Sequence, residues 1–181
     1  MKLNSSCYNL DMKKTAVVLI SMFVAFCPIA VSATSDAKTI SEAKKESITK
    51  NCSSIVEKLK ELQHEDSKIR VYLGRYYEII QLRFITPFNV RLSENTLSDD
   101  SFVKNQNDFS KGRNNFMIDF IEYQKELERL ISADCKNRPA EFYDILVRTR
   151  ELRKIVESDT KYIQGLMTEH LGLVKKIGEK L

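Results

Sequence analysis

FVKNQNDFSKGRNNFMIDFIEYQKELERL, residues 102–130, is the stretch that decides the fold. Large side chains recur in it at alternating intervals of three and four residues, which is typical of a helix that packs along a seam. Met117 and Ile121 widen the stripe, and a widened stripe faces more than one neighbour, as in a helical bundle. The seam positions are Phe102, Gln106, Phe109, Arg113, Phe116, Phe120, Tyr123, Leu127, Leu130 and Asp134.

The same rhythm returns on both sides of this stretch, so three helices are predicted. Tyr72 and Ile79 widen the first stripe, as Met167 and Val174 widen the third. The first seam is Ile48, Cys52, Ile55, Leu59, Leu62, Asp66, Ile69, Leu73, Tyr76 and Ile80. The third seam is Phe142, Ile145, Thr149, Leu152, Val156, Asp159, Ile163, Leu166, His170, Leu173 and Ile177.

Short motifs mark the helix boundaries. Thr39 and Glu42 have the spacing of a capping box. Pro87 ends or kinks the first helix, because the residue before a proline avoids the helical region. Ser98, followed by two aspartates, is typical of a helix start. Pro139 suits the first turn of the third helix.

These boundaries predict helices at about 40–85, 99–133 and 138–179. We expect an all-α fold, an elongated antiparallel three-helix bundle of coiled-coil type. The composition agrees, because the chain of 181 residues has no tryptophan, three prolines and five scattered glycines, which suits long helices better than a β-sandwich.

The N-terminal segment has the three parts of a signal peptide. Lys2, Lys13 and Lys14 form a positive region, an apolar run follows at 15–30, and short residues precede a cleavage point after Ala33. N-terminal sequencing of the exported protein would then begin with the next residue. The alternative is an uncleaved anchor, because the apolar run is about as long as a bilayer requires.

Cleavage divides the chain into a signal peptide at 1–33, a short disordered stub at 34–38 and one bundle domain at 39–181. Two cysteines, Cys52 and Cys135, remain in the mature chain. Their midpoint, about residue 93, coincides with the centre of the first interhelical connection, so an antiparallel hairpin brings them side by side. An even pair in an exported chain predicts a disulfide.

The connection at 86–98 is long for a helical hairpin, and long loops tend to be functional or disordered. Phe88, Val90 and Leu92 are candidate contacts of an exposed tip that binds a partner. The alternative is that they plug the open end of the bundle.

Two seam charges are predicted to pair. Arg113 and Asp159 each interrupt an apolar stripe, and both lie about 23 residues from the turn between helices two and three. An unpaired charge at such a position costs several kcal/mol, so we expect a structural ion pair that sets the helix register. Gly74 and Gly112 are predicted to lie at the same level along the bundle axis, where their missing side chains would leave room for the arginine.

Motifs for catalysis or cofactor binding are weak. Glu61 and His64 have the spacing of a di-iron ligand pair, but a second such pair is missing, so a solvated His64 is expected. His170 falls on a seam and is interpreted as a packing residue. No nucleophile motif or phosphate loop is found in the sequence, which predicts no enzyme, no catalytic residue, no metal and no cofactor.

The charge balance does not predict nucleic-acid binding. After cleavage, 26 basic residues face 24 acidic ones. Arg148, Arg150, Arg153 and Lys154 form a basic cluster, but glutamates are interleaved with it and no exposed aromatic residues accompany it. We interpret the cluster as a solvated helix face.

The stretches DCKNRPAEF (134–142) and LVRTRELR (146–153), together with Cys52 and the signal peptide, give the chain a resemblance. It resembles uncharacterised small secreted helical proteins of candidate-phylum, Saccharibacteria-type bacteria. The resemblance covers most of the mature chain and implies export and an all-helical fold, with no activity.

The expected function is that of an exported, non-enzymatic interaction or scaffold protein of the cell surface or extracellular space. Its tip loop or a helix face would bind an unknown protein partner, with no nucleic acid and, after cleavage, no membrane. The alternative is a chaperone of the periplasm or envelope. An enzyme ranks behind both.

Overall fold

The computed structural model describes residues 40–97 and 99–179. The predicted signal peptide, its cleavage point and the stub therefore lie outside the described residues. The described part contains helices and no strand: α1 (Glu42–Ile79), the π-helix η1 (Ile80–Ile85), α2 (Thr86–Glu94), α3 (Asp100–Ser132) and α4 (Pro139–Gly178).

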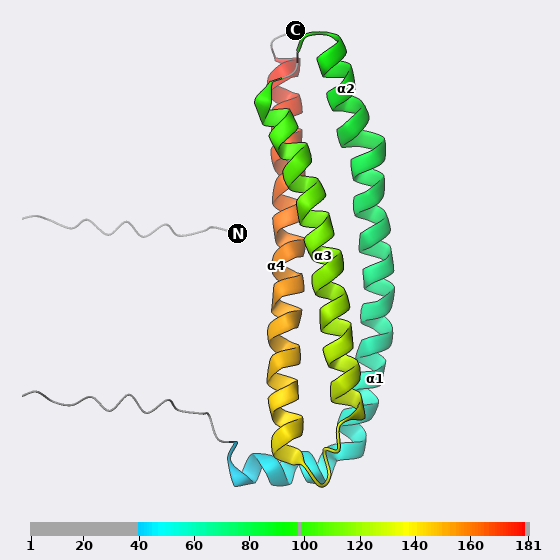
Figure 1. Cartoon of the computed structure of the whole chain (residues 1–181), viewed down its shortest axis with the longest axis vertical. Helices are drawn as coiled ribbons and strands as arrows, with labels where there is room; N and C mark the ends of the chain where they lie inside the picture. Colours follow the sequence, from blue (N-terminus) through cyan, green and yellow to red (C-terminus); the bar gives the residue numbers. More distant parts are fainter. Residues whose placement is uncertain (1–39, 98, 180–181) are drawn as a thin grey trace, which may run out of the picture. The chain divides into compact units, whose positions relative to one another are not determined.

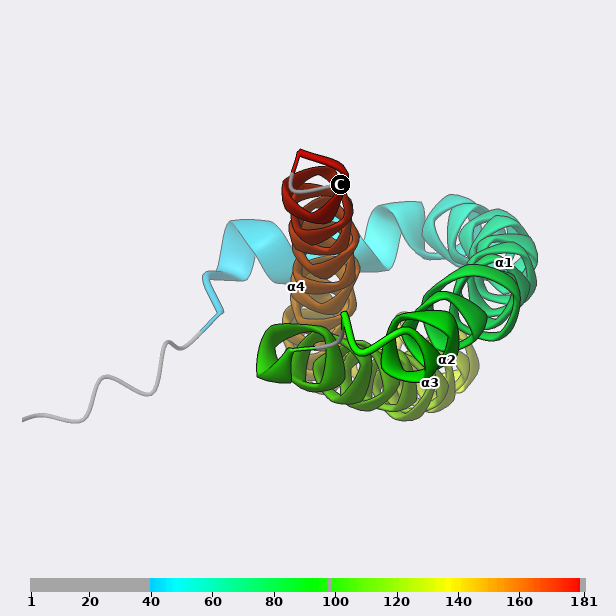
Figure 2. The same ribbon diagram turned by 90° about the horizontal axis from the view of Figure 1, so that it is seen from above.

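The all-α bundle is confirmed. In the described residues, α1, η1 and α2 form one continuous helical run, and this run, α3 and α4 are the three members of the bundle (Figure 1). Neighbouring members run antiparallel, and α3 packs along both α4 and α1 (Figures 1 and 2). The bounds of α3 and α4 agree with the predicted ranges to within one residue at each end.

The predicted end of the helix at Pro87 is wrong, because the helix passes through it. The proline occupies the first turn of α2, and the residues on both sides of the η1–α2 junction have right-handed helical backbone angles. In a regular α-helix the ring of Pro87 would clash with the carbonyl of Arg83. The wider π-helical turn that ends at Ile85 displaces the preceding carbonyls and accommodates the ring.

Aromatic side chains form the core between α1 and α3. Phe109 and Phe116 are fully buried, and Tyr77 of α1 is 1% exposed. The Tyr77 ring meets Phe116 edge-to-face, with 5.3 Å between ring centroids, and Phe116 meets Phe120 in the same way at 5.5 Å. Such pairs add about 0.5–1.5 kcal/mol each beyond the area they bury.

The seam of α3 departs from the prediction in its first half. Asn105 and Gly112 are buried there, whereas Gln106 and Arg113 are only partly buried. A Cβ atom at Gly112 would lie 3.2 Å from the ring of Tyr162, so this glycine admits the close approach of α4. At Gly74 the neighbour is Met117 instead, and the two glycines do not share one space.

The first turns of α1 lie across the end of the bundle where α3 leads into α4, and the helix then turns to run beside α3 (Figures 1 and 2). The side-chain amide of Asn51 donates to the backbone carbonyl of Ser47 at 2.8 Å, close to this bend. Side chains that compete for a backbone carbonyl are a known cause of helix bending.

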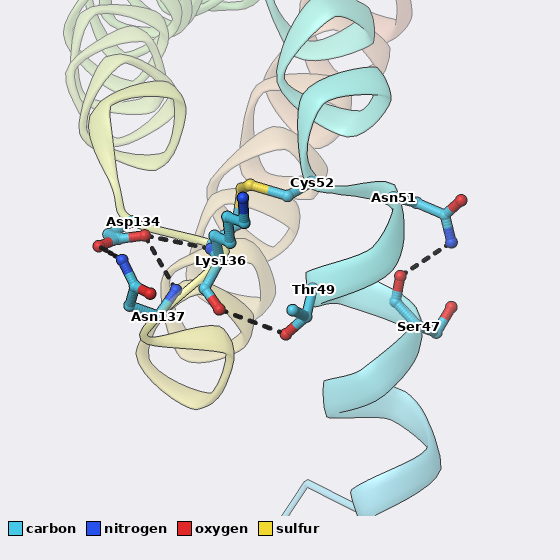
Figure 3. Close-up of a disulfide and its surroundings, with 8 residues drawn as sticks. Ser47, Thr49, Asn51, Cys52, Asp134, Lys136 and Asn137 are labelled. Atoms are coloured by element: carbon cyan, nitrogen blue, oxygen red, sulfur yellow. Dashed lines mark hydrogen bonds between the residues drawn. A yellow bond between two sulfur atoms is a disulfide. The ribbon is translucent and has the colours of Figure 1, made fainter.

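The Cys52–Cys135 disulfide is confirmed, with 5.6 Å between the two Cα atoms (Figure 3). It joins the bend of α1 to the α3–α4 turn. Asp134 organises that turn by accepting hydrogen bonds from the backbone N–H groups of Lys136 and Asn137. The Thr49 hydroxyl donates to the Lys136 carbonyl at 3.5 Å, beside the disulfide (Figure 3).

Candidate interaction surface

The predicted tip is a helix whose apolar residues point in different directions. Leu92 is 6% exposed, and the Phe88 ring packs on the Phe102 ring at 5.9 Å between centroids. The side-chain amide of Asn89 donates to the Phe102 carbonyl at 3.1 Å, which fastens α2 to α3. Leu92 is therefore buried and Phe88 is half-buried against α3, whereas Val90 is 50% exposed.

The predicted ion pair between Arg113 and Asp159 is wrong. No salt bridge joins them within the described ranges, because they lie on different sides of α3. Arg113 lines a surface hollow together with Gly74 of α1, and Asp159 of α4 faces Asp119 of α3. The two residues therefore do not share a face of α3.

Asp119 and Asp159 bring two carboxyl groups together between α3 and α4. One oxygen of Asp159, Oδ2, is buried. Burial, together with the neighbouring Asp119 carboxyl, raises the pKa of the Asp159 carboxyl to about 6. Two ionised carboxylates repel each other, so this contact favours a proton on one of them as the pH falls.

We expect the folding stability to fall as the pH rises from about 4 to about 6. In that window folded Asp159 holds a proton that it lacks when the chain is unfolded, so raising the pH favours unfolding. Asp159→Asn should remove this dependence and stabilise the protein at neutral pH by about 1 kcal/mol, a value reduced for the solvent contact that Asp159 retains. Urea unfolding at both ends of the window measures it. The exposed Asp144→Asn is the control, and an unchanged pH slope in Asp159→Asn would contradict the assignment.

A buried polar cluster connects all three helices. Asp66 of α1 is 5% exposed; its Oδ2 accepts from the Tyr123 hydroxyl of α3 at 2.6 Å, and its Oδ1 lies 3.4 Å from Arg153 Nη2 of α4. Next to it, the Gln124 amide donates to the Ser67 hydroxyl at 2.9 Å. Arg153 therefore belongs to this cluster, although the sequence placed it in a solvated basic face.

Four exposed apolar residues of α1 line one surface, which we call the α1 outer face and define as Val71, Tyr72, Tyr76 and Ile79. Their exposed fractions are 62%, 70%, 38% and 42%. The rings of Tyr72 and Tyr76 lie parallel, with 6.4 Å between centroids. A contiguous apolar surface of this kind on a helical bundle is typical of an interaction site.

Arginines border the α1 outer face, and we call Arg70, Arg75 and Arg113 the arginine flank. They line a hollow beside Val71 that contains a single carboxylate, Glu78. None of the three forms an ion pair within the part of the chain that the structure describes, and the Nε atom of Arg70 is buried without a hydrogen-bond partner. The surface is therefore apolar with a net positive border.

The two histidines do not form a metal site. His64 is exposed at one end of the α1 outer face, and His170 is 8% exposed beneath the rings of Phe88 and Phe102. Within residues 40–97 and 99–179, no group of three histidine, cysteine, aspartate or glutamate side chains is arranged to hold a metal ion. In the same residues no helix has the length and apolar character needed to span a bilayer.

Comparison with protein-family models, with curated proteins and with solved structures finds no match to the chain.

Sequence reasoning missed the α1 outer face and the arginine flank. The available signal was the width of the first stripe, in which Tyr72 and Ile79 add apolar area outside the seam. A helix at the edge of a three-membered bundle cannot bury two apolar sides, so the excess width was evidence for an exposed surface.

Proposed function

We propose that the protein is an exported, non-enzymatic helical interaction protein of the cell surface or extracellular space. It binds an acidic, apolar segment of a partner protein through the α1 outer face. The observation that carries the proposal is an exposed Tyr72–Tyr76 pair bordered by arginines that have no acidic partner in the described residues.

The positive charge of the arginine flank indicates which kind of partner this surface can bind. Arg70, Arg75 and Arg113 would repel the same residues of a second copy, which disfavours self-association through this face. A partner helix with acidic residues beside its apolar stripe would neutralise the arginine flank and cover the tyrosines. Tyrosine and arginine are among the residue types that most often dominate interface energetics.

The disulfide supports the proposed location. A bonded pair such as Cys52–Cys135 is compatible with an oxidising, extracytoplasmic compartment, because cytosolic thiols are kept reduced. The signal peptide expected at 1–33 would deliver the chain there. Both features agree with a role outside the cytoplasm.

A designed helical peptide tests the surface directly. We expect a peptide with a leucine stripe flanked by glutamates to bind at least tenfold more tightly than the same stripe flanked by lysines, and added salt to weaken the binding. Serine at Val71, Tyr72 and Tyr76 should reduce the affinity about tenfold or more, since each aromatic anchor contributes 1 kcal/mol or more. Fluorescence anisotropy of the labelled peptide gives the affinity.

The matched control is serine at Ile118 and Ile121 of α3, which are 63% and 41% exposed outside the α1 outer face. This variant should bind the acidic peptide like the unmodified protein. Equal affinity for both peptides would overturn the proposal. So would binding to anionic lipid vesicles in place of the peptide, or suppression of client aggregation without sequence preference, which is the behaviour of a chaperone.

A further inference from the structure

A second concave surface lies away from the α1 outer face, where η1 and α2 meet the last turns of α4. Its volume is about 290 Å³, near the lower limit of small-molecule pockets. Phe84 and Phe88 form one wall, and Leu171 and Val174 form the other. The apolar walls are thus supplied by two segments that are far apart in the sequence.

Two arginines stand beside this hollow. Arg83 of η1 and Arg91 of α2 line it on either side of Pro87. No carboxylate is among its lining residues, and neither arginine forms an ion pair in the described ranges. Arg83 lies within the π-helical turn, and π-helical turns occur frequently at functional sites.

The third polar group of the hollow is His170, which is more than nine-tenths buried. The side-chain amide of Asn105 donates to the Leu166 carbonyl at 3.0 Å, so its oxygen must face the histidine ring. His170 Nδ1 lies 3.1 Å from that oxygen and therefore carries the proton of this hydrogen bond. Nε2, on the far side of the ring, has no hydrogen-bond partner within the described residues.

We propose that this hollow binds a small monocarboxylate with a short apolar body. Arg83 and Arg91 hold the carboxylate, and His170 Nε2 shares a proton with it. The apolar body lies between the phenylalanine wall and the Leu171–Val174 wall. The small volume and the absence of a carboxylate among the lining residues favour one acid group and a compact tail.

Burial of His170 lowers its pKa, which favours the neutral ring in the free protein. A neutral ring leaves the lone pair of Nε2 available to a proton that is taken up from solvent as the carboxylate binds. Ligand binding would then change the chemical environment of Nε2 more than that of any other atom of the imidazole ring. The chain contains one other histidine, His64 on α1, which serves as an internal reference.

Octanoate is the probe, with n-octanol and inorganic phosphate for comparison. We expect octanoate to shift the His170 imidazole resonances of the exported protein saturably and to leave those of His64 unchanged. Octanol lacks the carboxylate and phosphate lacks the tail, so each should bind at least tenfold more weakly. Heteronuclear NMR titration reports all three.

Glutamine at both Arg83 and Arg91 should weaken octanoate about tenfold or more and leave octanol binding unchanged. The control variant, Arg150→Gln, removes an exposed arginine elsewhere and should bind octanoate normally. Circular dichroism of each variant confirms that it is folded. Absence of a saturable His170 shift, equal shifts with octanol, or full octanoate affinity in the double variant would each overturn the proposal.

Discussion

Replacing both Cys52 and Cys135 by serine is expected to lower the free energy of unfolding by about 4–5 kcal/mol in the chain-entropy model. The bond spans a sequence separation of 83 residues, and closing so long a loop removes many conformations from the unfolded chain. Because a small domain is stabilised by about 5–15 kcal/mol in total, the loss is a large fraction of the whole.

Loss of the disulfide should destabilise the first turns of α1 before the rest of the bundle. Apart from the disulfide, these turns are held by Ile48 in the core, by the Lys44 ammonium, which donates to the Tyr143 hydroxyl at 3.0 Å, and by Thr49. Hydrogen exchange should therefore show early loss of protection there, while α3 and α4 keep theirs.

Urea unfolding with and without reductant measures the size of the effect. Either single serine variant should match the double variant, since one cysteine cannot form the bond. A loss below 1 kcal/mol, or uniform loss of protection along the chain, would contradict this account.

Alanine at Asp66 is expected to cost about 2–3 kcal/mol of stability. The change leaves the buried Tyr123 hydroxyl without its acceptor and removes the partner of Arg153. The value is below the 3–5 kcal/mol of a fully buried pair, because the Arg153 side chain is 44% exposed and screened by solvent.

A double-mutant cycle separates this cluster from ordinary packing. Asp66→Ala combined with Tyr123→Phe should cost clearly less than the sum of the two single changes, because the second change removes the group that the first left unsatisfied. Tyr162→Phe is the matched control: its ring is 48% exposed, and we expect a change within about 0.5 kcal/mol. Additive costs would show that Asp66 and Tyr123 do not act together.

The seam of α4 was predictable because its large apolar residues recur without competition from a neighbouring position. Every buried residue of α4 lies on the predicted seam, from Phe142 to His170. The disulfide was predictable for a related reason. An antiparallel hairpin fixes which residues share a level, so counting from the connection was enough to pair Cys52 with Cys135.

The first half of the α3 seam was not predictable from periodicity alone. At 105–106 two amides stand side by side, and at 112–113 a glycine precedes an arginine, so neither pair offers an apolar residue to mark the inner position. Gly112 faces inward because the Tyr162 ring needs the space, and that requirement exists only once α4 is in place. The predicted Arg113–Asp159 ion pair was wrong for the same reason, because it placed Arg113 at the inner position that Gly112 occupies.

The connection at 86–98 was predicted to be a loop, but most of it is the helix α2. A proline normally ends a helix, but the π-helical turn before Pro87 lets the helix continue to Glu94. The same continuation lets Arg83 of η1 and Arg91 of α2 line one hollow together with His170. A candidate ligand site thus arose from the feature that the sequence rule excluded.

The crosswise start of α1 and the disulfide at its bend also determine how the bundle responds to tension. A pull on the chain ahead of Glu42 reaches Cys52 early, and the covalent bond passes the load into the α3–α4 turn. The rest of α1, with its tyrosines, then stays outside the force path. A protein anchored or stretched from that side would keep its outer face in register while the bond is oxidised, and would begin to peel from the first turn of α1 once it is reduced.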